Sequence, residues 1–164
     1  DNERASANGC GIRVRLFEKK EEFGEVGAGM QLAPNCTRLL DRLGILQQVQ
    51  ASAVFPKQIV WIDALNGQRL TAIDLGAKFI ETFGYPYIVV HRADLFEAIY
   101  QACLANSLIT MEKNRVVTSI DERPKSVMVE CADGTRYDCN MVIAADGLWS
   151  SLRKFVCDDG APHS

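Results

Sequence analysis

The chain has 164 residues, of which 48% are hydrophobic and 24% are charged, and it carries a formal net charge of −3. A length and composition of this kind are typical of one globular domain and exclude wholesale disorder. No basic run could neutralise a row of phosphates, and no apolar run approaches the ~20 residues that span a membrane, so we expect no nucleic-acid partner and no membrane span.

The six cysteines form no Cys-x-x-Cys pair, and the two histidines, His91 and His163, are far apart in sequence. A disulfide framework or a zinc site would need a closer and more regular spacing. The segment that starts at Asp1 has no apolar signal region. We therefore expect reduced cysteines, no metal site, and an intracellular, cytoplasmic protein.

The chain begins with a strand pattern and then a helix pattern. Residues 12–18 alternate and predict a strand that ends in the carboxylate of Glu18. A glycine-rich loop follows. Residues 35–46 place leucines at helical spacing, so we predict a helix there with Gly44 near its C-terminal end.

The middle of the chain predicts a hairpin, a strand and a second helix. Residues 58–65 and 68–75 flank Asn66-Gly67, the strongest short signal for a β-hairpin. A short apolar strand over residues 87–90 then leads to a helix with one apolar face over residues 95–103.

The last third predicts a β-meander and a final strand and helix. The meander strands are expected at 115–120, 126–131 and 135–144, with turns at Pro124 and Asp133-Gly134. Residues 142–145 are fully apolar, as a buried parallel strand would be, and residues 149–156 are predicted to be helical. The order of elements predicts a mixed α/β chain.

Two features near the start of the chain could bind a nucleotide. The Glu18 carboxylate could accept ribose hydroxyls at the carboxyl end of its strand, or it could be a solvated strand terminus. The glycines at 24, 27 and 29 run in the reverse order of the dinucleotide fingerprint. They could let backbone approach a flat ring or a phosphate, or they could simply make turns.

Two later features also allow either a ligand-binding or a purely structural interpretation. Arg92 lies between a predicted strand and a helix, where its guanidinium could reach a pyrophosphate or form an ordinary surface ion pair. The Asp146-Gly147 step follows the predicted buried strand, which suits either a ligand site or a plain strand end. No residues form a nucleophilic triad or a metal-bound water site, so any catalysis would depend on a bound cofactor.

Taken together, four motifs resemble one family. They are Glu18, the loop Gly27-Ala-Gly-Met-Gln-Leu-Ala-Pro-Asn35, His91-Arg-Ala-Asp-Leu95, and Ala145-Asp-Gly-Leu-Trp-Ser-Ser-Leu-Arg153. Their order and spacing resemble the FAD-dependent aromatic hydroxylases, the single-component flavoprotein monooxygenases such as salicylate hydroxylase. The resemblance runs from about Gly11 to Val156.

The resemblance implies a fold and roles for particular residues. The fold would be a partial Rossmann-like FAD-binding domain over residues 1–164, with a β-meander and with residues 56–86 contributing to an antiparallel substrate-domain sheet. The residues implied in FAD binding are Glu18 at the adenosine ribose, Ala28, Gly29 and Gln31 near the flavin and its linker, Arg92 near the phosphates, the backbone of Val116 or Val117 at the adenine, and Asp146 with Gly147 for both FAD and NAD(P)H.

The implied chemistry is the reduction of FAD by NAD(P)H and the O₂-dependent hydroxylation of a small phenolic or similar aromatic ring. The first Gly-x-Gly-x-x-Gly turn and a later Gly-Asp segment are absent, so we expect a fragment truncated at both ends and inactive alone. A truncated non-catalytic homologue is one alternative. Another two-dinucleotide-binding flavoprotein oxidoreductase is a second, and the motifs at His91–Leu95 and Asp146–Ser151 argue against it.

Overall fold

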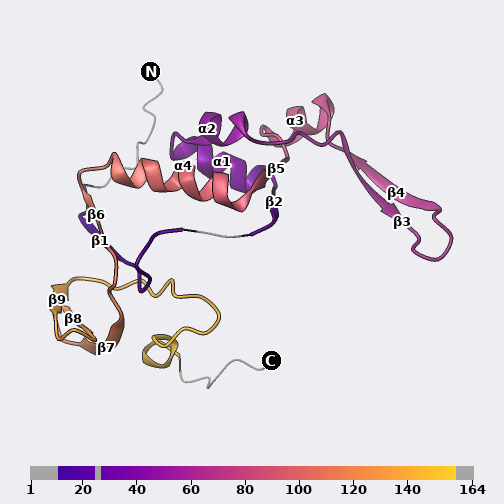
Figure 1. The fold of residues 1–164 in the computed structure, drawn as a ribbon. Coiled ribbons are helices and arrows are strands. Elements are labelled where there is room, and N and C mark those ends of the chain that lie inside the picture. The colour runs from indigo at the N-terminus through magenta and orange to yellow at the C-terminus, as the bar shows by residue number, and fades with distance from the viewer. Residues whose placement is uncertain (1–10, 25–26, 158–164) are drawn as a thin grey trace. The chain divides into compact units, whose positions relative to one another are not determined.

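The computed structural model describes residues 11–24 and 27–157, so Cys10 and His163 lie outside it. The chain divides into two compact units, which we describe separately (Figure 1). Unit 1 comprises Asp1–Val14 and Gly24–Thr110, and unit 2 comprises Arg15–Phe23 and Met111–Ser164.

Unit 1 combines four helices with two antiparallel strand pairs. Its elements are β2 (Gly29–Leu32), α1 (Pro34–Arg42), α2 (Leu46–Ala51), β3 (Gln58–Ile62), β4 (Arg69–Asp74), α3 (Ala77–Phe83), β5 (Ile88–His91) and α4 (Arg92–Leu104).

The core of unit 1 lies between the β2–β5 pair and the helices α1, α2 and α4. Val49 and Ile88 are fully buried there, and Val90 and Ala98 are nearly so. The remaining buried members of this cluster are Leu32, Leu40, Ile45 and Leu46. Burial of these side chains supplies the main favourable free energy of the unit.

The pairing of β2 with β5 was not predicted, because we expected a loop from Gly27 to Pro34. In the structure Gly29 pairs with His91 and Leu32 pairs with Ile88 in an antiparallel register. The four-residue strand is stabilised by its buried Leu32 and by β5 rather than by its own composition. This register brings the glycine-rich loop beside the start of α4.

The predicted helix over residues 35–46 is shorter in the structure, and the next helix, α2, which starts at the last predicted residue, was not predicted. Helix α1 starts with Pro34 in its first turn, where a missing N–H costs nothing, and it ends at Arg42. Gly44 then adopts a left-handed φ of 75° before α2 begins at Leu46. The position of Gly44 at the end of the first helix is confirmed.

The predicted hairpin and the predicted second helix are confirmed. Strands β3 and β4 pair antiparallel from Gln58↔Asp74, and Gly67 in the turn has a φ of 73°. Figure 1 shows this hairpin projecting beyond the helices of unit 1. Helix α4 contains the whole predicted range 95–103, while α3 was not predicted.

Strands β1 (Val14–Phe17) and β6 (Ile109–Glu112) form a two-stranded pair. One hydrogen bond joins Val14 N–H to the Leu108 carbonyl, and another joins Glu18 N–H to the Glu112 carbonyl, both at 2.9 Å. Because the bonded residues advance by the same step on each strand, the strands run parallel. Glu18 and Glu112 therefore lie at the same, carboxyl-terminal edge.

The β-meander predicted in the last third is confirmed. Strands β7 (Val117–Glu122), β8 (Val127–Cys131) and β9 (Arg136–Cys139) form an antiparallel sheet in that order. Gly134, in the predicted Asp-Gly turn, has a φ of 80°, a conformation that glycine adopts at little cost.

Two predictions near the C-terminal end are wrong. Residues 142–145 form no strand; Ile143 among them is 76% exposed, and the neighbouring Met141 is 69% exposed. A buried strand needs a strand beside it, and no strand in the described part of the chain pairs with this segment. Residues 149–156 contain only the short 3₁₀ helix η1 (Arg153–Phe155), and before it the Ser150 hydroxyl accepts the Leu152 and Arg153 N–H groups.

Candidate functional site

Glu18 occupies the residue after β1, where its main chain is held on both sides. Its N–H donates to the Glu112 carbonyl, and its carbonyl accepts the Arg115 N–H, both at 2.9 Å. The Glu18 carboxylate accepts the Lys20 N–H at 2.9 Å, which orients the half-buried side chain. The structure thus fixes a carboxylate at the carboxyl-terminal edge of two parallel strands, the edge at which such sheets bind ligands.

Val116 lies one residue beyond the Arg115 contact to Glu18. The chain turns sharply before it, because Asn114 adopts a left-handed φ of 56°. The Val116 carbonyl accepts the Ala132 N–H at 2.8 Å, which ties this segment to the meander. Unit 2 therefore brings Glu18 and Val116, two of the predicted site residues, to one edge.

A cluster of charged side chains beside Glu18 was not predicted. The half-buried Glu112 carboxylate pairs with the Arg15 and Arg115 guanidinium groups and accepts the Tyr137 hydroxyl at 2.7 Å. Arg115 also pairs with Asp133. The Tyr137 ring packs on Phe17, with 4.7 Å between ring centroids, and Arg15 lies over its face.

The cluster changes the proton affinity of its members. The Tyr137 hydrogen bond, followed by the two arginines, holds the pKa of Glu112 below its usual value. The same hydrogen bond raises the pKa of Tyr137. Hydrogen bonds from Thr135 and the charge of Arg115 lower the pKa of Asp133. Glu112 and Asp133 therefore stay ionised near neutral pH, while the Tyr137 hydroxyl keeps its proton.

Asp146, the third predicted residue in unit 2, begins a tight turn. Its carboxylate accepts the Ser150 hydroxyl at 2.6 Å and the Ser151 N–H at 3.0 Å. These hydrogen bonds, that of Ser150 above all, lower the pKa of Asp146. No hydrogen bond joins Asp146 to Glu18 or Val116 in the described part of unit 2, so the structure does not bring these residues together.

Gly27, Ala28 and Arg92 meet in unit 1. The Arg92 N–H donates to the Ala28 carbonyl at 3.3 Å. A Cβ atom at position 27 would lie 3.2 Å from Cδ and 3.3 Å from Nε of Arg92, closer than ordinary van der Waals contact. The missing side chain at Gly27 therefore makes room for the arginine, which starts α4.

Gly29 and Gln31 belong to β2 and lie beside β5. Gly29 pairs with His91, the residue before Arg92. The Gln31 side-chain oxygen accepts the Tyr87 hydroxyl at 2.6 Å. Unit 1 thus brings together Ala28, Gly29, Gln31 and Arg92, the predicted residues of this unit, along one strand pair.

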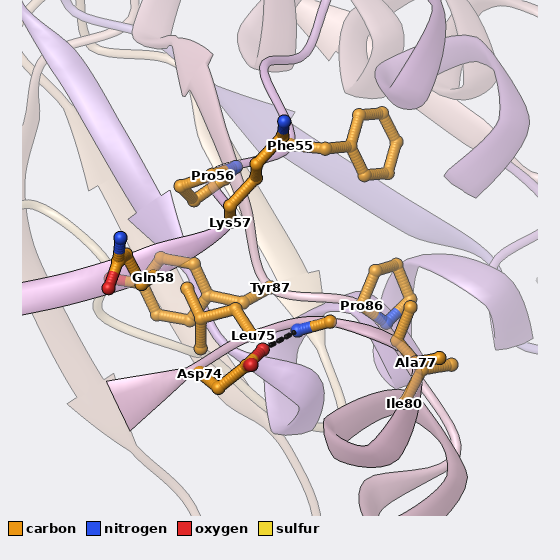
Figure 2. Close-up of a pocket in the computed structure, with 11 residues that line it drawn as sticks. Phe55, Pro56, Lys57, Gln58, Asp74, Leu75, Ala77, Ile80, Pro86 and Tyr87 are labelled. Atoms are coloured by element: carbon orange, nitrogen blue, oxygen red, sulfur yellow. Dashed lines mark hydrogen bonds between the residues drawn. The ribbon is translucent and has the colours of Figure 1, made fainter. Parts of the chain in front are cut away.

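A pocket of about 610 Å³ lies at the base of the β3–β4 hairpin (Figure 2). Phe55, Leu75, Ile80 and Tyr87 are among its apolar lining residues, and Lys57 also lines it. The Asp74 carboxylate is engaged by the Gly76 N–H at 2.6 Å, as the dashed line in Figure 2 shows. Apolar walls with few polar groups are typical of small-molecule sites.

The described residues contain neither a metal-binding cluster nor a membrane-spanning helix. No group of three or more His, Cys, Asp or Glu side chains within residues 11–24 and 27–157 is placed to hold a metal ion. The five cysteines of these residues are all unpaired thiols. No helix in the same ranges is both long and apolar enough to cross a membrane.

The amino-acid sequence is similar to one family model and to proteins of known name. A family model described as lycopene cyclase protein matches residues 27–158. The 3-hydroxybenzoate 6-hydroxylase 1 of Aquipseudomonas alcaligenes is 36% identical over 153 residues, which cover 93% of this chain and 39% of that protein. The 6-hydroxynicotinate 3-monooxygenase of Bordetella bronchiseptica is 34% identical over 90% of this chain and 38% of that protein.

The fold is also similar to solved structures. The crystal structure of HpxO from Klebsiella pneumoniae, complexed with FAD and uric acid, aligns with a TM-score of 0.68 and 25% identity over 85% of this chain and 34% of that chain. This likeness confirms the predicted α/β fold class. The chain spans less than half of the length of the curated relatives it matches.

Proposed function

Because this chain belongs to the lycopene cyclase protein family and is a relative of aromatic hydroxylases, we propose that it is part of the FAD-binding domain of an NAD(P)H- and O₂-dependent monooxygenase. The similarity to 3-hydroxybenzoate 6-hydroxylase 1 and 6-hydroxynicotinate 3-monooxygenase confirms the family resemblance carried by the four sequence motifs. The function itself is carried by one observation above the others: Glu18 and Val116 lie together at the carboxyl-terminal edge of a parallel strand pair.

The side chains of unit 2 suit the adenosine end of FAD. A carboxylate in the position of Glu18 can accept ribose hydroxyls, and the backbone at Val116 can contact a purine edge. Lys20 N–H holds one Glu18 oxygen, so the carboxylate keeps its orientation before a ligand arrives. Such preorganisation reduces the entropy that binding would otherwise cost.

The side chains of unit 1 suit the phosphates and the flavin end. Gly27 leaves a space that the Arg92 side chain uses, and a guanidinium matches phosphate oxygens. Ala28, Gly29 and Gln31 supply a strand with little side-chain bulk at its start, where backbone can approach a flat ring.

Asp146, in unit 2, is proposed to contribute to both FAD and NAD(P)H binding.

FAD supplies the redox chemistry when it is bound, and the protein supplies binding, orientation and exclusion of water. We propose residues 56–86 for the substrate side, since the pocket at the hairpin base has apolar walls and a lysine. The names of the two curated relatives point to aromatic carboxylates, hydroxybenzoate and hydroxynicotinate, as the substrate class. A cytoplasmic location, where NAD(P)H is available, belongs to the same proposal.

The proposed function is tested by FAD titration of the protein that carries this chain and of its Glu18→Gln variant. We expect the substitution to weaken FAD binding by about 1–3 kcal/mol, the usual contribution of a hydrogen bond to a charged group. Glu22→Gln is the matched control, because Glu22 is an exposed carboxylate in the same segment. Equal FAD affinity in all three proteins would refute the ribose role of Glu18.

The activity is tested separately in the protein that carries this chain. We expect NAD(P)H oxidation and O₂ uptake that depend on 3-hydroxybenzoate or a similar aromatic acid, with a hydroxylated product. Absence of bound FAD and of any such turnover would contradict the proposal.

A further inference from the structure

The Glu112 carboxylate joins three segments of unit 2 that are far apart in the sequence. It pairs with Arg15 on β1, with Arg115 in the turn before β7, and with the Tyr137 hydroxyl on β9. Its side chain is 19% exposed, so these contacts are partly shielded from water. Partly shielded charged hydrogen bonds are stronger than those on an open surface.

The same residue is also bonded through its main chain. The Glu112 carbonyl accepts the N–H of Glu18, while its carboxylate holds Arg115, whose own N–H donates to the Glu18 carbonyl. Val116 follows Arg115 directly in the chain. Glu112 is therefore bonded to the main chain of Glu18 and, through its carboxylate, to the residue that precedes Val116.

We propose that Glu112 is a positioning residue for the adenosine end of the cofactor site, with Arg115 and Tyr137 as the groups through which it acts. This inference rests on the proposed function. The inference extends that function from the residues that would touch FAD to the cluster that sets the spacing between the ribose carboxylate and the adenine-binding backbone.

Charge balance explains why a neutral side chain would not replace Glu112. Arg15 and Arg115 are both cationic, and Asp133 neutralises only one of them. A glutamine at position 112 would remove the charge that holds the two guanidinium groups together. Its amide N–H₂ is a donor and would find no acceptor on an arginine. Arg115 would then keep only its contacts to Asp133 and to the Thr135 hydroxyl among the described side chains, and the segment that leads to Val116 would shift.

The test compares the binding of FAD with that of two ligands that each contain one part of FAD. ADP contains the adenosine end, FMN contains the flavin end, and FAD contains both. In Glu112→Gln we expect ADP and FAD binding to weaken by the same factor, roughly tenfold, with FMN binding unchanged. Tyr137→Phe keeps both arginine pairs and should show the same pattern with a smaller factor. Glu130→Gln is the matched control, because Glu130 pairs with the exposed Arg136 on the same sheet.

Each result is decisive. Equal weakening of FMN and ADP, or an unchanged ADP affinity in the Glu112 variant, would overturn the positioning role and leave the proposed function standing. If Glu112→Gln does not fold, the same three titrations on Tyr137→Phe decide, and unchanged ADP binding there overturns the role. If the unaltered protein binds neither FAD nor ADP, the proposed function fails and the positioning role fails with it.

Discussion

At the scale of single residues, Gly27 shows how a missing side chain can determine the place of another. The Arg92 side chain lies so close to Gly27 that a Cβ atom there would be 3.2 Å from Cδ of the arginine. The sequence alone supported a simple turn at this glycine, because nothing local indicates which side chain comes close. The structure shows that the glycine is needed for the approach of an arginine 65 positions later in the chain.

Replacement of Gly27 by alanine should therefore weaken FAD binding. The new Cβ would push Arg92 by a few tenths of an ångström, and we expect a loss of roughly threefold to tenfold in FAD affinity, which is about the contribution of one ordinary hydrogen bond. The measurement is FAD titration followed by protein or flavin fluorescence. Gly24→Ala is the matched control, because no atom lies within 4 Å of a Cβ built there. A loss of the same size in the control would point to a general effect on the loop.

At the scale of elements, Thr37 links helix α1 to the segment before β5. Its side chain is fully buried, and its hydroxyl donates to the Pro86 carbonyl at 3.0 Å. Substitution by valine keeps the shape but leaves that carbonyl without its donor. We expect Thr37→Val to lower the free energy of unfolding by about 1–2 kcal/mol in urea denaturation.

The control for this substitution is Thr82→Val. Thr82 is exposed on α3 and its hydroxyl bonds only within its own helix, to the Lys78 carbonyl at 2.8 Å. A change within about 0.5 kcal/mol is expected for such a surface position. Equal effects of both substitutions would show that the Thr37–Pro86 bond does not anchor α1.

Elements with strong local signals were predicted, and elements that depend on partners were not. The hairpin at Asn66-Gly67, helix α4 and the meander are determined by turn residues and by periodicity within each segment. Strand β2 exists because β5 pairs with it. Residues 142–145 have the pattern of a buried strand but no strand beside them in the described part of the chain, so their apolar pattern led to a wrong prediction.

At the scale of the whole molecule, the carboxyl groups with a lowered pKa among residues 11–24 and 27–157 all lie in unit 2. They are Glu112, Asp133 and Asp146, whose usual pKa values are near 4.5, 3.8 and 3.8. A carboxyl whose pKa is lower in the folded chain stabilises the fold above its unfolded pKa, and this stabilisation is lost as pH falls through the folded pKa. We expect the free energy of unfolding to fall as the solution is acidified below about pH 4.5.

The contribution of the Glu112 cluster to this acid sensitivity can be isolated with Tyr137→Phe. The Tyr137 hydroxyl is the largest cause of the lowered pKa of Glu112. The variant should therefore be less stable than the unaltered protein at pH 7, and its free energy of unfolding should fall less on acidification. Tyr87→Phe is the control, since the Tyr87 hydroxyl bonds the neutral Gln31 amide and its loss should not depend on acid pH. Parallel pH profiles for the two variants would contradict the assignment.

The sequence by itself determined the family, through four short motifs in a matching order, and it identified Glu18, Ala28, Gly29, Gln31, Arg92, Val116 and Asp146 as candidate FAD contacts. Only the tertiary structure decided which of these meet and what holds them. Arg15 and Glu112 pair across 97 residues, and Tyr137 reaches Glu112 across 25. Periodicity and turn chemistry are local properties of the chain, whereas contacts between distant side chains arise only when the strands that carry them are packed together.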